Sequence, residues 1–365
     1  MINAEEIMVE AYKRGASDIY ITAGMLPIYR VYDQLIPWHK DGTKKKLTPD
    51  DTEMFVREII SEEDLQKFKE DLELDCVHSI SGATRYRVNV FKQRGSYAVV
   101  LRLIPEIRTM EDLNLPNVDV IKQQLDQPNG LILVTGPTGS GKSSTLAAMI
   151  DYINSTQQKH IITAEDPVEF LHRHKQSIVN QRELGQDTKS FPEAIKHMLR
   201  ETPDVILVGE MRDYETIRWV LTAAETGHLV FSTLHTNNAP ETIDRIIDVF
   251  PSHQQNQVRT QLSATLRLVL AQRLLRARQT GQVPALEIMV ATQAVRNSIR
   301  EGRTHQLYSV IQTGGEKGMM TLEKSLATLF FKKKIARDDA MQAANDKEEL
   351  VRMIGEGAKS SLNDW

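Results

Sequence analysis

Cysteine is almost absent from this chain of 365 residues, in which Cys76 is the only one. A single thiol excludes an intrachain disulfide, and it excludes a zinc site built from several cysteines. Cys76 lies in an alternating apolar stretch, where a lone cysteine is most simply a small core residue. The sequence therefore indicates a protein without disulfides and without zinc.

Long apolar runs and an excess of basic charge are also missing. No segment approaches the roughly 20 apolar residues that a membrane-spanning helix needs. Residues 1–10 carry three glutamates and no basic residue, unlike a secretory signal. The formal net charge of −4 argues against a dedicated nucleic-acid binder, which usually has a clear basic excess. We therefore expect a cytoplasmic protein that binds no nucleic acid.

Length and pattern predict two domains, because a single core rarely grows beyond roughly 250–300 residues. Residues 1–105 have the mixed pattern of an α+β domain, with a helix over 5–14 and strands over 18–38, 84–91 and 96–104. Thr48-Pro49 and Ser61 with Asp64 are typical helix starts between these strands. Residues 106–116 have a proline at 116 and follow Pro105, and we interpret them as a linker.

The remainder, residues 117–365, alternates short apolar strands with amphipathic helices as far as residue 234. The expected strands are 131–134, 160–164, 205–208 and 229–234, and the expected helices are 143–154, 190–200 and 214–226. This order predicts an α/β domain with a mostly parallel sheet and helices on both faces. From about 252 to 365 the apolar spacing is helical, with a short strand possible at 284–290.

The most informative motif is Gly136-Pro137-Thr138-Gly139-Ser140-Gly141-Lys142-Ser143, which satisfies the phosphate-loop pattern G-x-x-x-x-G-K-[ST]. A strand leads into it, and a helix leads out through Ser144. Backbone N–H groups of such a loop and the positive end of the helix bind phosphate. Lys142 is expected to reach the β- and γ-phosphates, and the Ser143 hydroxyl is expected to bind Mg²⁺. The motif predicts a nucleoside triphosphate site.

Acidic residues follow two of the expected strands. Glu210 comes after the apolar strand 205–208, and Gly209 gives it room. In nucleotidases a buried strand delivers such a carboxylate beside Mg²⁺. Glu165, Asp166 and Glu169 follow the strand before it. Acids at the carboxyl ends of parallel strands lie on the ligand-binding edge, where one of them could deprotonate the attacking water.

Two histidines and two arginines raise further alternatives. His228 and His235 flank the strand 229–234, about 23 Å apart in an extended chain, so they are not a metal pair. Each could contact nucleotide or a neighbouring domain from one end of the strand. Arg87 and Arg102 lie on strands of the first domain. The charge of Arg102 falls on an otherwise apolar strand face and needs a partner, either a nearby carboxylate or a γ-phosphate across a domain or subunit boundary.

Four boxes occur in the order seen in secretion ATPases: the phosphate loop, Glu165–Phe170, Asp204–Asp213 and Thr226–Asn237. The sequence resembles the type II/type IV secretion superfamily of hexameric motors, and within it the PilT-type retraction ATPases of type IV pili. Residues 17–21 and 294–302 are similar to the early and late signatures of that subfamily. Tyr20 replaces the usual histidine of the first signature, and Ser298 replaces the usual leucine of the second.

The resemblance implies a PAS-like N-terminal domain followed by a RecA-like ATPase domain with a helical C-terminal part, assembled as a homohexamer. It implies that Glu169 is the general base, that Glu210 is a second acid near Mg²⁺ and that His228 is the histidine-box residue of the catalytic site. Arg87 and Arg102 match arginines of the N-terminal domain that such motors place on the γ-phosphate of ATP.

The function implied by the resemblance is that of a Mg²⁺-dependent ATPase motor that powers pilus retraction and twitching motility. Such a motor acts at the inner face of the cytoplasmic membrane, on the platform protein of the pilus machine. Pilus-extension and type II secretion ATPases generally carry a tetracysteine zinc motif, so a single cysteine favours retraction. Three alternatives stay open: a pilus-extension or type II secretion ATPase, a RecA-like nucleic-acid translocase, which the acidic charge disfavours, and an accessory nucleotide-binding subunit, which intact Lys142, Glu169 and Glu210 disfavour.

Overall fold

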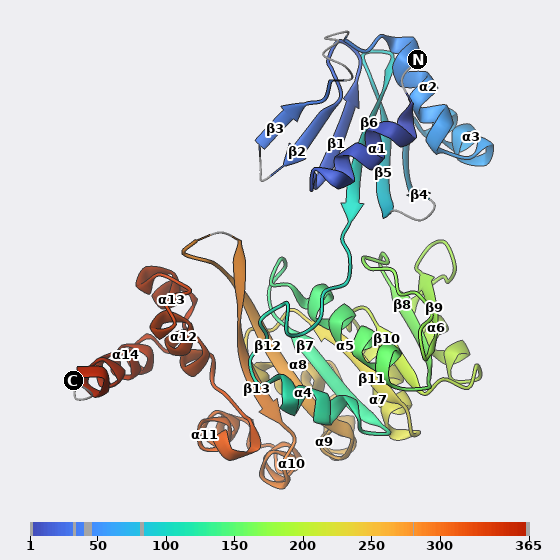
Figure 1. Cartoon of the computed structure of the whole chain (residues 1–365). Coiled ribbons are helices and arrows are strands. Elements are labelled where there is room, and N and C mark those ends of the chain that lie inside the picture. The colour runs from blue at the N-terminus through green and yellow to red at the C-terminus, as the bar shows by residue number, and fades with distance from the viewer. Residues whose placement is uncertain (1–2, 32–33, 40–45, 81–83, 280, 363–365) are drawn as a thin grey trace. The chain divides into compact units, whose positions relative to one another are not determined.

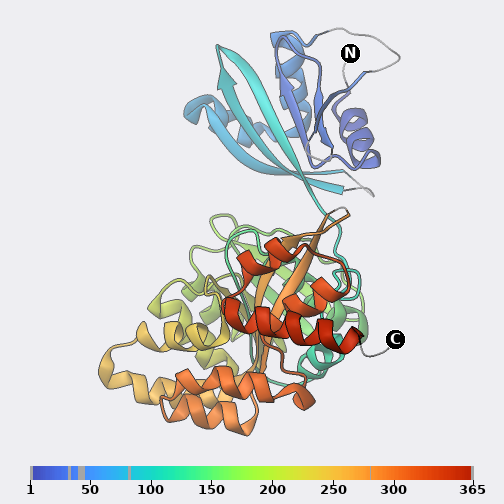
Figure 2. The same cartoon turned by 90° about the vertical axis from the view of Figure 1, so that its left-hand side faces the viewer.

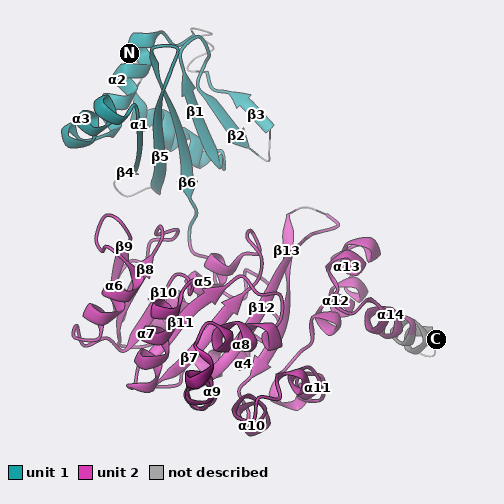
Figure 3. Ribbon diagram, turned by 180° about the vertical axis from the view of Figure 1, so that it is seen from behind, with its two compact units in different colours: residues 1–106 teal, residues 107–365 magenta. Residues whose placement is uncertain are grey.

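The chain forms two compact units, Met1–Glu106 and Ile107–Trp365, coloured separately in Figure 3. The computed structural model describes residues 3–31, 34–39, 46–80, 84–279 and 281–362. None of the helices in these ranges is both long enough and apolar enough to span a membrane.

Unit 1 is a six-stranded antiparallel sheet with the strand order β3-β2-β1-β6-β5-β4 (Figure 1). Its strands are β1 Asp18–Thr22, β2 Ile28–Val31, β3 Gln34–Pro37, β4 Glu73–Ile80, β5 Thr84–Gln93 and β6 Ser96–Ile104. Its helices are α1 Ala4–Lys13, α2 Pro49–Ile59 and α3 Glu62–Asp71. Apolar residues of all three helices form one core with alternate residues of the strands, such as Tyr86, Val88 and Val90. The helices therefore cover one face of the sheet, and residues such as Arg87 lie on the other.

Local sequence signals set the helix boundaries of unit 1. Thr48 begins α2 with a capping box, in which its side chain and that of Asp51 each accept a backbone N–H. Ser61 caps α3 by accepting the N–H of Asp64, and α3 ends at Leu72 in a left-handed conformation. Cys76 packs half-buried against the core, where burial raises the pKa of its thiol to about 12.

Unit 2 is built on a seven-stranded sheet with the order β13-β12-β7-β11-β10-β8-β9. The strands are β7 Gly130–Thr135, β8 His160–Glu165, β9 Ile178–Glu183, β10 Val205–Val208, β11 Leu229–Leu234, β12 Leu266–Arg276 and β13 Gln282–Val290. All neighbours are parallel except β12 and β13. The mostly parallel sheet agrees with the alternation of strands and helices in the sequence.

Helices cover both faces of this sheet. They are α4 Val118–Leu125, α5 Lys142–Thr156, α6 Phe191–Met198, α7 Tyr214–Glu225, α8 Ala239–Asp248, α9 Ser252–Thr265, α10 Gln293–Arg300, α11 Leu307–Thr313, α12 Leu322–Phe331, α13 Arg337–Ala343 and α14 Lys347–Leu362. Leu131 and Leu133 of β7 pack with α6 to α11, and the alternate residues Ile132 and Val134 pack with α4 and α5. Helices α12 to α14 form a further cluster with the ends of β12 and β13, drawn red in Figure 2.

Beyond residue 252 we expected mainly helices and a possible strand at 284–290. β13 contains that strand, whereas β12 is a long strand where helix was expected. β12 and β13 form an antiparallel pair, and β12 also pairs with β7. The run from Leu268 to Ala271 is apolar and buried on both faces. Such a run has the same periodicity in a buried strand and in a buried helix, which is why the pattern was misleading.

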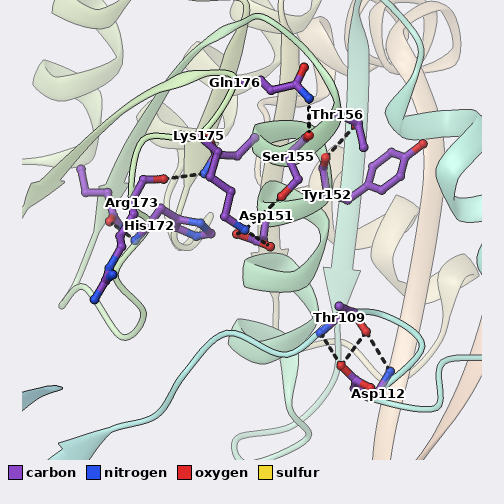
Figure 4. Close-up of polar contacts among 12 residues, drawn as sticks. Thr109, Asp112, Asp151, Tyr152, Ser155, Thr156, His172, Arg173, Lys175 and Gln176 are labelled. Carbon is purple, nitrogen blue, oxygen red and sulfur yellow. Dashed lines mark hydrogen bonds and ion pairs between the residues drawn. The ribbon is translucent and has the colours of Figure 1, made fainter. Parts of the chain in front are cut away.

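Of residues 106–116, interpreted above as a linker, Glu106 ends unit 1 and residues 107–116 belong to unit 2. Met110 and Leu115 are buried in the core shared with α5. The N–H of Asp112 donates to the Thr109 hydroxyl at 3.1 Å, and that hydroxyl donates to the Asp112 carboxylate at 2.8 Å (Figure 4). The segment is therefore a folded turn anchored by two apolar side chains, despite its flanking prolines.

Glu287 of β13 is a carboxylate buried at the start of α8. Its side chain is 1% exposed, and its Oε1 accepts the N–H of Ala239 at 2.6 Å. Its Oε2 has no partner within the described parts of the chain. Burial raises the pKa of Glu287 to about 7, the hydrogen bond from Ala239 opposes this, and the Glu323 carboxylate adds to it.

We expect Glu287→Gln to stabilise the protein more at pH 8 than at pH 5. Since the pKa is raised in the folded state, folded Glu287 keeps a proton up to about pH 7 that the unfolded chain has lost near pH 4.5. The free energy of unfolding therefore falls as the pH rises through this window, and a neutral amide removes the effect. Thermal melts at both pH values test this, with a shift of roughly 2–4 °C per kcal/mol. An equal difference at both pH values would contradict it.

Candidate nucleotide site

The phosphate-loop motif connects β7 to α5 at the carboxyl edge of the parallel strands. Gly136, Gly139 and Gly141 have φ angles of 144°, 78° and 84°, a region that side chains rarely adopt. A Cβ atom on Gly136 would lie 2.3 Å from the backbone oxygen of Gln272 in β12. The loop therefore needs glycine for its backbone conformation and, at its first residue, for its close contact with β12.

The loop ends where α5 begins. Gly141 precedes the helix and supplies no side-chain cap, so the first N–H groups of α5 remain suited to an anion. The Lys142 ammonium group donates to the carbonyl oxygens of Gly136 at 2.8 Å and Pro137 at 3.1 Å. Burial lowers the pKa of Lys142, and the charges of Glu210 and Glu169 oppose this. Positive charge and N–H donors thus gather at one end of the loop.

A pocket of about 480 Å³ opens over this loop. Loop residues 138–144 line one side, and the acidic box and the ends of β10 and β11 line the other: Glu165, Asp166, Glu169, Gly209, Glu210, Arg212, Thr233 and His235. Lys142, Ser143, Glu169 and Glu210, which lie far apart in the sequence, therefore share one cavity.

Glu210 is held by two basic side chains. Nε of Arg212 donates to its Oε2 at 2.7 Å, and Nε2 of His235 lies 3.0 Å from its Oε1. The hydrogen bond to Glu210 raises the pKa of Arg212. The sequence pattern alone does not identify Arg212 as a site residue. The one sequence feature that points to it is its position two residues after Glu210.

The two glutamates of the acidic box lie in different surroundings. Oε1 of Glu165 accepts from the Thr163 hydroxyl at 2.6 Å and from the Gln181 amide at 3.2 Å. Burial raises the pKa of Glu165. Glu169 is exposed at the wall of the pocket. Glu165 is therefore fixed by its neighbours, whereas Glu169 is accessible to solvent and to a ligand.

The segment after the acidic box is tied to α5 (Figure 4). The Lys175 ammonium group donates to the Asp151 carboxylate at 2.7 Å and to the Ser155 hydroxyl at 3.0 Å. The side-chain amide of Gln176 donates to the Ser155 carbonyl at 2.8 Å. Burial lowers the pKa of His172, which lines the pocket, to about 4. This wall therefore presents a neutral imidazole at pH 7, which the sequence pattern did not suggest.

His228, expected at the catalytic site, lies elsewhere in unit 2. β11 runs parallel to β7 with Leu229 opposite Gly130 and Leu234 opposite Thr135, so His228 is at the edge of the sheet away from the phosphate loop. Its Nδ1 lies 3.0 Å from the Ala223 carbonyl oxygen. The length of β11 separates His228 from His235, and only His235 follows the carboxyl end of that strand. The structure therefore brings His235, and not His228, to the pocket.

The arginines of unit 1 lie in a row across its sheet. Arg87 on β5 is opposite Arg102 on β6, which is opposite Asp18 on β1. Nε of Arg102 donates to Oδ1 of Asp18 at 2.9 Å, and Nε of Arg30 lies 3.7 Å from the other oxygen. The Arg102 side chain is 69% exposed, although that of Asp18 is 6% exposed. The carboxylate partner thus exists, and it leaves most of the guanidinium group accessible.

The late signature segment forms α10 and the turn after it. The Ser298 hydroxyl donates to the Ala294 carbonyl at 3.0 Å within the helix, so the polar replacement is satisfied locally. Arg296 Nη1 donates at 2.6 Å to the carbonyls of both Ser263 and Ala264. Its guanidinium group thereby fastens α10 to the end of α9. At the early signature, the Tyr20 hydroxyl accepts from Arg30 at 2.9 Å.

Known proteins of one family are similar to this protein along nearly the whole chain. Residues 1–352 match the family described as type II/IV secretion system protein. The type IV pilus retractation ATPase PilT of Pseudomonas aeruginosa is 47% identical over 351 residues, covering 94% of this chain and 99% of that protein. A twitching motility protein of Neisseria gonorrhoeae is 48% identical over 297 residues, covering 81% and 79%.

A solved structure gives the same result. The crystal structure of the pilus retraction motor PilT with bound ADP superimposes with a TM-score of 0.87 at 48% identity, covering 96% of this chain and 100% of that one. The fold expected from the sequence, an N-terminal α+β domain followed by a mostly parallel α/β domain, is confirmed by this match. With a family match over residues 1–352 and relatives at this identity, the chain belongs to the type II/IV secretion system protein family.

Proposed function

We propose that this protein is a Mg²⁺-dependent ATPase motor that drives retraction of a type IV pilus. The observation that carries the proposal is the convergence of Lys142, Ser143, Glu169 and Glu210 on one pocket above the phosphate loop. Relatives described as a pilus retraction ATPase and as a twitching motility protein, similar over most of their length, support the cellular role.

Five side chains of the pocket and the loop backbone have distinct roles in binding. The loop N–H groups and Lys142 hold the β- and γ-phosphates, for which Lys142 exchanges its bonds to the loop carbonyls. The Ser143 hydroxyl and the Glu210 carboxylate are hard oxygen donors of the kind that Mg²⁺ prefers. Held by these two groups, the ion would supply positive charge that neutralises the phosphate oxygens. Arg212 and His235 orient the Glu210 carboxylate through the contacts described above.

Hydrolysis then needs a group that takes a proton from water. The water oxygen forms a bond to the γ-phosphorus, the bond from that phosphorus to the bridging oxygen breaks, and ADP and phosphate leave. We assign the acceptor of the water proton to Glu169, since its carboxylate is exposed on the pocket wall. Oε1 of Glu165 already accepts hydrogen bonds from Thr163 and Gln181, so Glu165 is a less accessible base.

The proposal extends to the assembly. Arg87 and Arg102 of one copy act on the γ-phosphate held by the loop of another copy, so that six copies in a ring form complete sites. The exposure of the Arg102 guanidinium group supports this assignment. The ring works at the cytoplasmic face of the inner membrane, where the platform protein of the pilus machine transmits its motion.

Deletion of the gene tests the direction of the motor. Cells that lack the protein should keep or over-accumulate surface pili and lose twitching, because assembly continues without withdrawal. Pili are counted by electron microscopy and motility is measured on agar. A plasmid copy of the wild-type gene should restore motility, and a copy with Lys142→Ala should not. Cells without pili would instead identify an extension motor, and hydrolysis stimulated by single-stranded DNA would identify a translocase.

A further inference from the structure

Gln272 is a buried amide on an apolar strand, directly beside the phosphate loop. β12 pairs with β7 as far as Ala271 opposite Thr135, so Gln272 lies next to Gly136, where the loop begins. Its side chain is 3% exposed, and the residues before it from Leu268 to Ala271 are all buried and apolar. A polar group in such surroundings is destabilising unless its hydrogen bonds are made.

Both ends of this amide bond to the structure around the phosphate loop. Nε2 of Gln272 donates to the carbonyl oxygen of Ser140 at 2.7 Å. Oε1 of Gln272 accepts from the hydroxyl of Thr145, in the first turn of α5, at 2.8 Å. A carbonyl oxygen can only accept, which fixes the orientation of the amide. One side chain therefore bridges the residues on either side of the segment from Gly141 to Ser144.

The loop glycines make room for this residue. A Cβ atom on Gly136 would lie 2.3 Å from the backbone oxygen of Gln272, and one on Gly141 would lie 2.8 Å from its Nε2. Contacts under 3.0 Å do not occur between real Cβ atoms and their neighbours, so Gln272 fills the space behind both glycines. Gly136 therefore accommodates the backbone of Gln272, and Gly141 accommodates its side-chain amide.

We propose that Gln272 is a positioning residue that fixes the phosphate loop in the conformation that binds nucleotide phosphates. By holding Ser140 and Thr145 at a set separation, it fixes the backbone that carries the loop N–H groups, Lys142 and Ser143. The inference rests on the proposed ATPase activity. It adds a residue from the C-terminal half of the chain that is not among those lining the pocket.

The test compares Gln272→Met with the wild-type protein. Methionine has a similar length and keeps the site apolar, but it cannot donate to Ser140, and its thioether is only a weak acceptor for Thr145. We expect kcat/KM for ATP to fall by about 10²-fold, as for other small misplacements of binding groups. Most of the loss should be in KM, and the dissociation constant of ADP, measured by titration calorimetry, should rise in parallel.

Two further variants separate positioning from stability. Thr145→Val removes only one hydroxyl and should raise KM for ATP in the same direction even if Gln272→Met folds poorly. Combined with Gln272→Met it should add little, because both changes break the same bridge. Ser325→Ala is the matched control. The buried hydroxyl of Ser325 in α12 accepts the N–H of Leu286 in β13, on the same sheet as Gln272, at 3.1 Å and does not touch the loop. It should lower the melting temperature and leave KM unchanged.

The outcomes distinguish this inference from the proposed function. Wild-type protein that neither binds ADP nor hydrolyses ATP would overturn the function itself. An active wild type together with a folded Gln272→Met variant of unchanged KM and ADP affinity would overturn only the positioning role. A Gln272→Met variant with a lower melting temperature and an unchanged KM, as expected for Ser325→Ala, would also overturn the positioning role.

Discussion

Glu169→Gln is expected to stop ATP turnover while ATP binding stays nearly intact. The change keeps the size of the side chain and one hydrogen-bonding oxygen, and it removes the negative charge together with the capacity to take a proton from water. Loss of a general base lowers rates by roughly 10²–10⁴-fold. Steady-state phosphate release and the affinity for a labelled nucleotide, measured on the same preparation, should therefore separate.

The neighbouring residues provide controls for this expectation. Lys142→Ala should abolish turnover and also weaken binding, because it removes a charge that contacts the phosphates. Glu165→Gln changes the other glutamate of the acidic box, whose oxygen already accepts from Thr163 and Gln181. It should retain more activity than Glu169→Gln. Wild-type hydrolysis by Glu169→Gln combined with an inactive Glu165→Gln would move the role of base to Glu165.

Arg102→Ala is expected to lower hydrolysis by roughly 10³–10⁵-fold, the effect of an arginine that acts on a transferred phosphoryl group. The ion pair joins the exposed Arg102 side chain to the buried Asp18 carboxylate, which keeps its contacts with Ser17 and Arg30 when Arg102 is replaced, so loss of this pair alone should cost far less than such a fall in rate. If the arginine acts on ATP bound by another copy, an inactive Arg102→Ala protein mixed with inactive Lys142→Ala should regain some turnover. Mixed rings contain sites in which both halves are intact.

Asp18→Asn is the matched control for the arginine. It weakens the same ion pair but leaves the guanidinium group in place, so hydrolysis should be reduced far less than in Arg102→Ala. Activity per subunit of the wild type should also rise with protein concentration as rings form. Normal hydrolysis by Arg102→Ala in assembled rings, or equal losses in the two variants, would show that the arginine is a structural charge.

Local signals made much of the fold and the pocket predictable from the sequence. The phosphate loop and the acids after β8 and β10 follow short apolar strands, and parallel strands bring their carboxyl ends to one edge. Those features depend on neighbours in the chain. The acidic box and Glu210 therefore reached the pocket as expected.

Features that depend on distant partners could not be predicted in this way. The strand β12 has no periodicity that distinguishes it from a buried helix, and only its pairing with β7 reveals Gln272 beside the loop. Whether His228 or His235 lies at the pocket depends on the direction of β11 relative to β7, the strand that leads into the loop. Arg212 gains its meaning from the position of the Glu210 carboxylate, which no spacing rule gives.

The place of β12 beside β7 also has a consequence for the order in which the protein is made. Gln272 follows Ser140 by 132 residues, so the wall behind the phosphate loop is synthesised long after the loop itself. Domains fold from the N-terminus as they leave the ribosome, and contacts between distant residues form last. Unit 1 can therefore fold early, whereas a nascent chain that ends before residue 266 carries the complete phosphate-loop motif without the strand that supports it.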